Sequence, residues 1–344
     1  MLKRTDLLNI GCLTVNRACN NRCRWCYAQD TDFTKSEMPL ETARKLLLIC
    51  KDCGVGSINI LGGEPTLYAN LTEVIKITRD YGMDPSIVTN GRAFAKKKFV
   101  QKIAASGLKN LNVSIKAGSK KDYISFTGAD GYDQMVTGFK NLQDADFDAS
   151  ASVTFNRELM KSYNKIIETI ILMGAKKIIV EFCNPIIVNN SIVEVGAPNP
   201  QEIVAWTNTI FNALLSTGVD FAINPNIPLC FFTKTDTDKM IEADSLIGGC
   251  HMRCGNVLIF LPNGDLIPCH QFTDNILAEF KKDFFDSNSF KTFLENDPSI
   301  IEFYKISSFF PAENCANCND WKKCGGGCLV KSFHYAPSNY VPQL

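Results

Sequence analysis

Short apolar runs alternate with longer amphipathic segments along the first two thirds of the chain. The runs are rich in β-branched residues, as buried parallel strands are, and lie at 8–15, 56–61, 84–90, 109–116, 149–155 and 176–182. The intervening segments have helical spacing, and several end in the glycine that often follows a helix: 40–52, 70–82, 95–107, 132–143 and 158–174. A further helix is predicted at 200–218, and the pattern stops near Pro225.

This alternation predicts an α/β fold, a partial barrel of six β/α units with its active site at the carboxyl ends of the strands. Beyond Pro228, glycine, cysteine and turn signals such as PNGD dominate the sequence. We therefore predict a barrel over residues 1–227 and a small, cysteine-rich, loop-rich domain over residues 228–344.

Charge and hydropathy exclude two classes of partner. The 36 basic residues balance 36 acidic ones, and the one dense basic cluster, 96–98, is most simply a solvated helix face, so nucleic acid is not expected. No apolar run approaches the roughly 18 residues that a membrane span needs. The N-terminal apolar stretch is short and is interrupted by Asp6, which argues against export. A cytoplasmic location away from membranes is expected.

Fifteen cysteines are the anomaly in the composition. Cytosolic thiols are kept reduced, so clustered cysteines there indicate metal binding or redox chemistry rather than disulfides. Three lie between residues 19 and 26 and seven between 250 and 328. The scattered five are expected to be small buried apolar side chains: Cys12, Cys50, Cys53, Cys183 and Cys230.

Cys19, Cys23 and Cys26 follow the first predicted strand with the spacing C-x3-C-x2-C. Three thiolates can ligate three irons of a 4Fe-4S cluster and leave the fourth iron open to a second molecule. A zinc site would need a fourth protein ligand. The spacing therefore favours an open iron-sulfur cluster at the carboxyl end of this strand.

Further motifs end the next three strands: GGEP at 62–65, Asn90 in VTNG and Ser114 in VSIK. With the cysteine motif they resemble the radical S-adenosylmethionine (SAM) enzymes, over roughly residues 8–224. The resemblance implies that Gly62, Gly63 and Glu64 receive the methionine amino group. It also implies that Trp25 packs by the adenine and that Asn90 and Ser114 are cofactor-binding residues near the ribose.

The resemblance also implies a mechanism. One electron, from a reductant such as flavodoxin or ferredoxin, passes through the cluster to SAM and yields methionine and a 5'-deoxyadenosyl radical, which removes a hydrogen atom from a substrate. Many relatives read S-x-D at the fourth strand, whereas Lys116 stands here. Substrate, the SAM carboxylate and solvent are the three partners open to it.

The second domain resembles the SPASM extension of these enzymes, which carries two auxiliary iron-sulfur clusters of the 4Fe-4S type. The carrying residues are Cys254, Gly264 and Cys269, followed by C-x2-C-x5-C-x3-C at 315–328, a spacing that alone would also suit a zinc ribbon. The resemblance assigns Cys250, Cys254, Cys269 and Cys328 to the first cluster and Cys315, Cys318 and Cys324 to the second.

The second auxiliary cluster is one cysteine short, because the family supplies a further cysteine and this sequence has none after Cys328. Three alternatives stay open: a non-cysteine ligand, His334 or Asp320; a distant thiol, Cys230; or an open iron that binds a substrate thiolate.

His270 follows Cys269 directly and is a candidate catalytic base. The anaerobic sulfatase-maturating enzymes have an aspartate base at the matching position, so histidine counts against that reaction. The alternative is a histidine that hydrogen-bonds to cluster sulfurs or packs on the module.

Relatives with this extension act mostly on peptides and proteins. We therefore expect a precursor peptide or protein substrate. The expected reaction is maturation of a ribosomally synthesised and post-translationally modified peptide (RiPP maturation), such as oxidative thioether or carbon-carbon crosslinking. Since eighteen residues precede Cys19, a leader peptide would be read by a separate leader-binding protein or by the barrel mouth. The alternatives are a small-molecule or tetrapyrrole-modifying oxidoreductase, formylglycine formation, and a non-enzymatic electron-transfer module.

Overall fold

The computed structural model describes residues 4–28, 36–188, 191–194, 196–272, 274–310 and 313–335. The strands in these ranges are β1 Ile10–Thr14, β2 Ser57–Leu61, β3 Asp84–Thr89, β4 Asn110–Ser114, β5 Asp148–Phe155, β6 Lys177–Phe182, β7 Ile186–Val188, β8 Ser191–Val193, β9 Asp220–Asn224, β10 Val257–Phe260 and β11 Leu266–Ile267. The α-helices are α1 Leu40–Asp52, α2 Leu71–Asp80, α3 Lys97–Ala105, α4 Lys120–Thr127, α5 Tyr132–Asp144, α6 Arg157–Met160, α7 Tyr163–Leu172, α8 Pro200–Leu215, α9 Lys234–Glu242, α10 His251–Cys254, α11 Ser287–Asn296, α12 Pro298–Ser307, α13 Trp321–Cys324 and α14 Leu329–Tyr335. Short 3-10 helices are η1 Arg4–Leu7, η2 Pro65–Leu67, η3 Arg92–Ala95, η4 Leu229–Phe231, η5 His270–Phe272 and η6 Glu313–Asn317.

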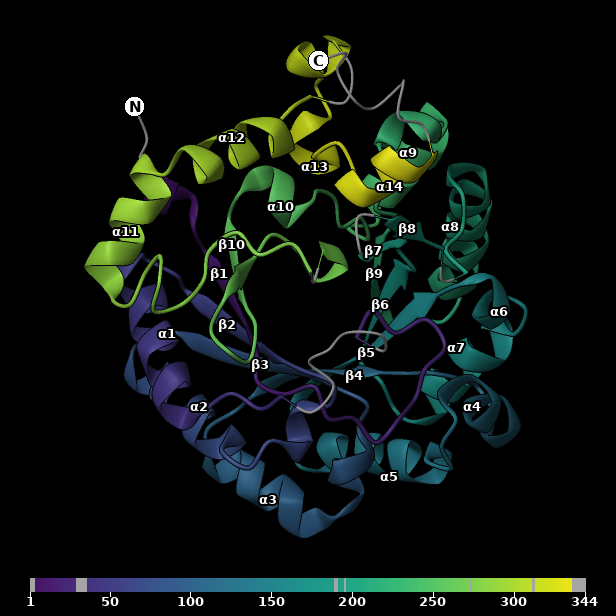
Figure 1. Ribbon diagram of the computed structural model, residues 1–344. Helices are drawn as coiled ribbons and strands as arrows, with labels where there is room; N and C mark the ends of the chain where they lie inside the picture. The colour runs from purple at the N-terminus through teal and green to yellow at the C-terminus, as the bar shows by residue number, and fades with distance from the viewer. Residues whose placement is uncertain are drawn as a thin grey trace.

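The main sheet has the strand order β11-β10-β1-β2-β3-β4-β5-β6-β9, and every neighbouring pair except β10 with β11 is parallel. Figure 1 shows these strands as an arc, with α1, α2, α3, α5, α7 and α8 outside it. The α/β partial barrel is therefore confirmed, including all six predicted strands. The sequence pattern missed β9, which adds a parallel strand beside β6, and the helix α4.

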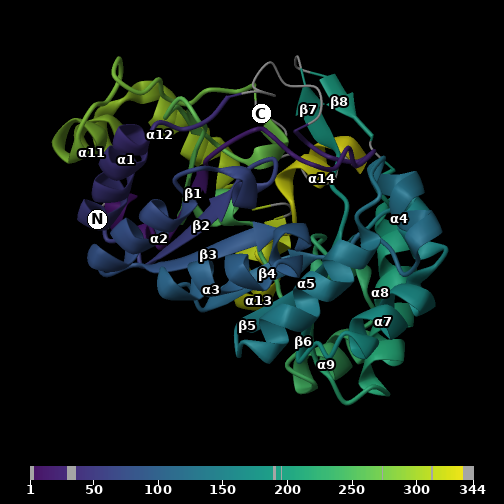
Figure 2. The same ribbon diagram turned by 90° about the horizontal axis from the view of Figure 1, so that it is seen from below.

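Alternating side chains give the sheet two different faces. In β2, Ile58 and Ile60 are fully buried in the main apolar core, and Ser57 and Leu61 are only partly buried. Figure 2 shows α1, α2, α3 and α5 along the outer face, where this core lies. Because side chains alternate along a strand, the remaining residues point into the arc, where the functional site is expected.

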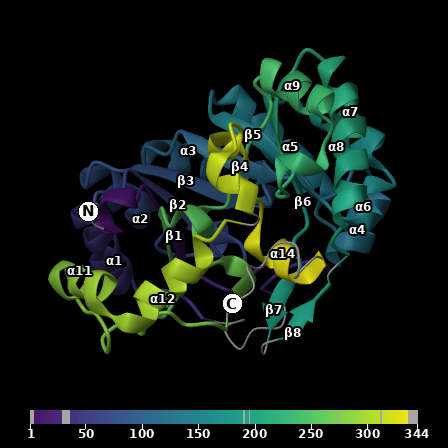
Figure 3. The ribbon, with the colours of Figure 1, turned by 90° about the horizontal axis from the view of Figure 1, so that it is seen from above.

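The C-terminal segment completes the arc on the side of β1. Ile10 of β1 pairs with Val257 of β10, although the two are far apart in the sequence. Figure 3 shows α14 beside the hairpin formed by β7 and β8, and Figures 1 and 2 show the same neighbours. The predicted division of the chain at residue 228 stays a prediction, since the second part contributes strands to the same sheet as the first.

Two simpler expectations are largely confirmed. The basic cluster at 96–98 is exposed, with its last two residues beginning α3. Four of the scattered cysteines are buried: Cys12, Cys50, Cys53 and Cys183. Cys230 is exposed, so its assignment to the core was wrong. No helix in the described part of the chain is long and apolar enough to cross a membrane.

Candidate active site

A cavity of about 600 Å³ opens at the carboxyl ends of the strands. The residues predicted to hold SAM and its cluster all line it: Cys19, Cys23, Cys26, Trp25, Gly62, Gly63, Glu64, Asn90 and Ser114. Lys116, whose partner the sequence left open, lines it as well. The same cavity is also lined by His270 and by three of the four cysteines assigned to the first auxiliary cluster, Cys250, Cys269 and Cys328. Two groups of thiols from opposite ends of the sequence therefore face one space.

Two glycines let the turn after β2 lie against the segment that leads to Cys19. The Gly63 N–H donates to the Asn16 carbonyl at 2.9 Å, and the Glu64 N–H donates to the Ala18 carbonyl at 2.8 Å. A Cβ on Gly63 would lie 2.5 Å from the Ala18 carbonyl oxygen, closer than real atoms approach. Glycine at this position therefore allows the direct backbone contact that positions the cysteine loop.

The Glu64 carboxylate organises the floor of the cavity and is 1% exposed. Its Oε1 accepts from the Thr66 N–H at 3.1 Å, the Thr66 hydroxyl at 2.6 Å and the Thr89 hydroxyl at 2.7 Å. Its Oε2 accepts from the Asn90 N–H at 2.7 Å. An ionised carboxylate offers about four lone pairs, two on each oxygen, so Oε2 keeps room for a ligand ammonium.

The three N-terminal thiols lie close together. Burial raises the pKa of Cys19 to about 11, and the charges of Glu64, Cys23 and Cys26 contribute to the rise. The Asn21 N–H donates to Cys19 Sγ at 3.4 Å and favours the thiolate. Neutral thiols at such sites need a compensating positive charge, such as bound iron, to ionise.

Two cations lie beside these thiols. Burial raises the pKa of Cys23, and the charge of Lys116 opposes that rise; the Lys116 ammonium donates to the Ser114 hydroxyl at 2.7 Å. Arg17 is 4% exposed, interacts electrostatically with Cys26, and its guanidinium has no hydrogen-bond partner among the described residues. Since a buried cation requires anionic partners, this donor set fits a thiolate-ligated, negatively charged cluster.

Comparison with known proteins decides the nature of this half of the chain. Residues 13–170 match the model of the radical SAM superfamily, and this match contains the three thiols and the GGEP turn. Residues 13–170 form a radical SAM domain. A radical SAM domain is expected to bind SAM and a 4Fe-4S cluster, and the three cysteines and the cations beside them suit that pair.

Curated relatives match part of the chain. A protein of Saccharolobus islandicus named "Probable GTP 3',8-cyclase" is 28% identical over 168 residues, which cover 48% of this chain and 54% of the relative. A protein of the same name from Thermococcus kodakarensis is 28% identical over 153 residues, 44% of this chain and 48% of its own length. The chain thus spans about half the length of the curated relatives it matches.

Solved structures match nearly the whole fold. SuiB of Streptococcus suis bound to SAM has a TM-score of 0.71 at 17% identity, covering 98% of this chain and 76% of SuiB. The anSMEcpe protein with bound SAM has a TM-score of 0.71 at 15% identity, covering 97% of this chain and 93% of its own. The radical SAM domain and the C-terminal segment therefore share one known architecture.

The predicted adenine and ribose residues of the radical SAM domain have defined surroundings. Trp25 is buried and packs edge-on against Phe126, with 6.0 Å between ring centroids. The Asn90 amide donates to the Asn20 side chain at 2.7 Å, which fixes its orientation beside the cysteine loop. Both residues line the cavity, and their contacts with SAM stay predictions.

The thiols assigned to the first auxiliary cluster also lie close together. Burial raises the pKa of Cys269, and the charges of Cys328 and Cys250 raise it further. Burial also raises the pKa of Cys254, and the charge of Cys250 adds to this rise. Within the described ranges no three such side chains surround one point closely enough for a single metal ion. A 4Fe-4S cluster spreads its ligands over separate irons.

Two buried cations missed by the sequence analysis accompany these thiols. The Lys331 ammonium is buried without a hydrogen-bond partner among the described residues, and burial lowers its pKa to about 8, opposed by the charge of Cys328. Arg253 interacts with Cys250 and Cys328, and donates to the Gly327 carbonyl at 3.2 Å. Cysteine spacing gives no signal for either residue, because both are recognised only by what they face in the fold.

His270 lies on η5, immediately after Cys269, and lines the cavity. Its ring packs on Tyr27, with 5.3 Å between centroids. Burial, together with the charge of Arg17, lowers the pKa of His270 to about 4. The imidazole is therefore neutral near pH 7, as a base must be, and its predicted catalytic role stays a prediction.

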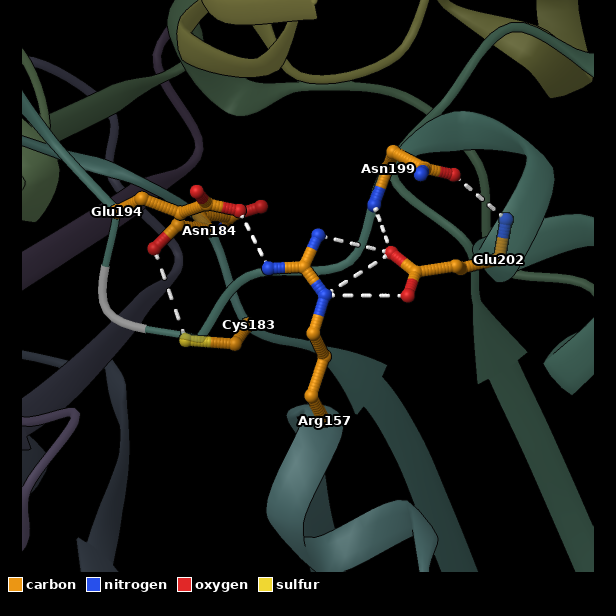
Figure 4. Close-up of polar contacts among 6 residues, drawn as sticks. All are labelled: Arg157, Cys183, Asn184, Glu194, Asn199 and Glu202. Atoms are coloured by element: carbon orange, nitrogen blue, oxygen red, sulfur yellow. Dashed lines mark hydrogen bonds and ion pairs between the residues drawn. The ribbon is translucent and has the colours of Figure 1, made fainter.

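A salt-bridged cluster fixes the wall of the cavity that follows β6. Figure 4 shows Arg157 between Glu202 and Glu194, with nitrogen–oxygen distances of 2.9 and 2.6 Å. Glu202 also accepts from the Asn199 N–H at 2.8 Å in the capping box of α8. The cluster ties α6, β8 and α8 together next to Cys183, which lines the cavity. It therefore supports the segment that carries Cys183.

Proposed function

We propose that this protein is a radical SAM oxidoreductase that oxidatively modifies a ribosomally made peptide. One observation carries the proposal: Cys19, Cys23 and Cys26, predicted to hold the SAM-binding cluster, line the same cavity as Cys250, Cys269 and Cys328. A substrate bound in this cavity would lie near the SAM site, where hydrogen is abstracted, and near the cysteines that would hold an electron-accepting auxiliary cluster. An oxidative crosslink requires both.

Different residues of this chain have different roles in the proposed reaction. Bound to the reduced cluster, SAM supplies a 5'-deoxyadenosyl radical that takes a hydrogen atom from the substrate. Glu64 Oε2 holds the methionine ammonium, and Trp25 packs against the adenine. His270 accepts the proton that leaves the substrate as it is oxidised. Cys250, Cys254, Cys269 and Cys328 would hold the first auxiliary cluster, which would supply an acceptor for the electron.

A peptide substrate has support from one solved relative of the fold. The structure of SuiB bound to the precursor peptide SuiA has a TM-score of 0.72, covering 98% of this chain and 75% of SuiB.

A small-molecule substrate is the second candidate. Its support is the name of the curated relatives, "Probable GTP 3',8-cyclase", whose similarity covers 48% of this chain. Arg17 also favours this candidate, because its buried guanidinium would pair with an anionic group of a small substrate.

Anaerobic co-expression with the small reading frames beside the gene tests the peptide proposal. We expect one peptide to lose two hydrogen atoms, measured by mass spectrometry, when the wild-type protein is present and not when Cys19, Cys23 and Cys26 are alanine. Unchanged peptides, together with turnover of a nucleotide by the purified enzyme, would instead establish the second candidate. Absence of 5'-deoxyadenosine from SAM and dithionite would exclude both.

Replacing Lys116 by methionine is expected to weaken SAM binding about tenfold, since a charge-assisted hydrogen bond contributes about 1.5–3 kcal/mol. The assignment is that the Lys116 ammonium, beside Cys23 and Ser114, holds the SAM carboxylate. Equilibrium dialysis under anaerobic conditions measures the Kd. Lys116→Arg, which keeps the charge, is the matched control and should stay near wild type. Equal affinity of the methionine variant would direct Lys116 to substrate instead.

A further inference from the structure

The second group of C-terminal cysteines meets a thiol from outside its own sequence motif. Cys230 lies on η4, between β9 and α9, and is separated from Cys324 by more than ninety positions. The Leu229 N–H donates to Cys324 Sγ at 3.3 Å, so η4 lies directly against this thiol. The Cys328 N–H donates to the Asn226 carbonyl at 2.9 Å. The segment 226–230 therefore lies along 324–328.

The glycines of the motif permit this close approach. Gly327 has φ of 68°, in the left-handed region, and a Cβ there would lie 2.8 Å from the Ile227 backbone and 2.9 Å from Pro228. Any other residue would push η4 away from the motif. Gly327 therefore allows the chain to turn and also lets the segment that carries Cys230 lie close to the C-terminal cysteine motif.

The three motif thiols surround Cys230 electrostatically. Cys324, Cys315 and Cys318 all interact electrostatically with Cys230, so the four thiols lie in one neighbourhood. The motif thiols also interact with one another. Burial raises the pKa of Cys324, and the charges of Cys315 and Cys318 add to this rise. The buried cation Arg253 interacts with two of these thiols, Cys315 and Cys324. A cation beside them favours a negatively charged, thiolate-ligated group at this place.

We propose that Cys230 is the fourth ligand of an iron-sulfur cluster held with Cys315, Cys318 and Cys324. The inference rests on the proposed function, which places auxiliary clusters in this segment. Thiolate is a soft ligand that iron-sulfur clusters prefer to the carboxylate of Asp320 or the imidazole of His334. With four cysteine ligands this cluster has no iron open to a substrate thiolate.

The test uses the full-length protein with Cys19, Cys23 and Cys26 replaced by alanine, purified anaerobically, so that only C-terminal iron is seen. We expect about eight iron atoms in this background. Adding Cys230→Ala should remove between one and four of them and give the electron paramagnetic resonance signal of a three-iron cluster, or loss of one cluster's signal. Cys53→Ala, a buried thiol remote from the motif, is the matched control and should change neither.

Two further variants separate the competing ligands. Asp320→Asn and His334→Gln should keep the full iron content and an unchanged spectrum. The inference is overturned if Cys230→Ala keeps both, if either competing variant causes the loss instead, or if zinc replaces iron. A background protein that holds no iron overturns the auxiliary clusters of the proposed function together with this inference. By contrast, eight irons that are insensitive to Cys230 overturn this inference alone.

Discussion

Simultaneous replacement of Cys19, Cys23 and Cys26 by alanine abolishes the reductive cleavage of SAM and leaves the C-terminal iron in place. The physical reason is that these thiols follow β1 in one loop and line the cavity, and alanine in their place offers iron no ligand. Chromatographic detection of 5'-deoxyadenosine after addition of SAM and dithionite measures cleavage, and iron analysis measures the remaining clusters.

Cys50→Val serves as the control for this experiment, because Cys50 is fully buried in α1 and faces the apolar core. It should keep cleavage and iron content, with at most a small change in stability. Cleavage by the triple variant above the protein-free background would show that the open cluster is held elsewhere.

Replacing Glu64 by glutamine is expected to abolish SAM cleavage and to lower the free energy of unfolding by about 2 kcal/mol. The carboxylate accepts from four donors on the turn after β2 and at the end of β3. In the glutamine variant an NH₂ group replaces one carboxylate oxygen. At least one of the four donors then faces another donor and loses its acceptor. Denaturant unfolding of the protein and a SAM-cleavage assay check the two effects.

Glu73→Gln is the matched control, because Glu73 lies on α2 at the surface, where its ion pair with Lys76 is about half exposed. Exposed pairs of this kind contribute less than about 1 kcal/mol. A Glu64→Gln variant with wild-type stability would mean that the four donors find other acceptors. Retained SAM cleavage would remove Glu64 from the methionine site.

Local signals predicted the barrel half of the molecule well. The six parallel strands are continuous apolar runs between helices with clear ends, and the strand ends with their motifs follow from that alternation. The segment 158–174 contains two helices instead of one, because the chain turns between Met160 and Tyr163. β9 was missed because its five residues, DFAIN, lead directly into the turn at Pro225, where the alternating pattern stops.

Contacts between residues far apart in the sequence could not be predicted from residue spacing. Cys230 is an isolated cysteine whose neighbours in space follow more than eighty residues later, so only the fold brings it to Cys315, Cys318 and Cys324. Arg17 and Lys331 look like ordinary surface cations in the sequence, and their importance comes from burial beside thiols. The pairing of β10 with β1 is equally invisible, because parallel pairing needs no local turn signal.

That pairing sets the order in which the molecule can be completed. As the chain leaves the ribosome, β1 has β2 for one neighbour, and its other edge has no partner until Val257 to Phe260 have been made. Parallel contacts between such distant residues form slowly, and an exposed strand edge invites association with other chains. The cysteine loop follows this strand directly. We therefore expect the cluster held by Cys19, Cys23 and Cys26 to be loaded stably only after most of the chain has been synthesised.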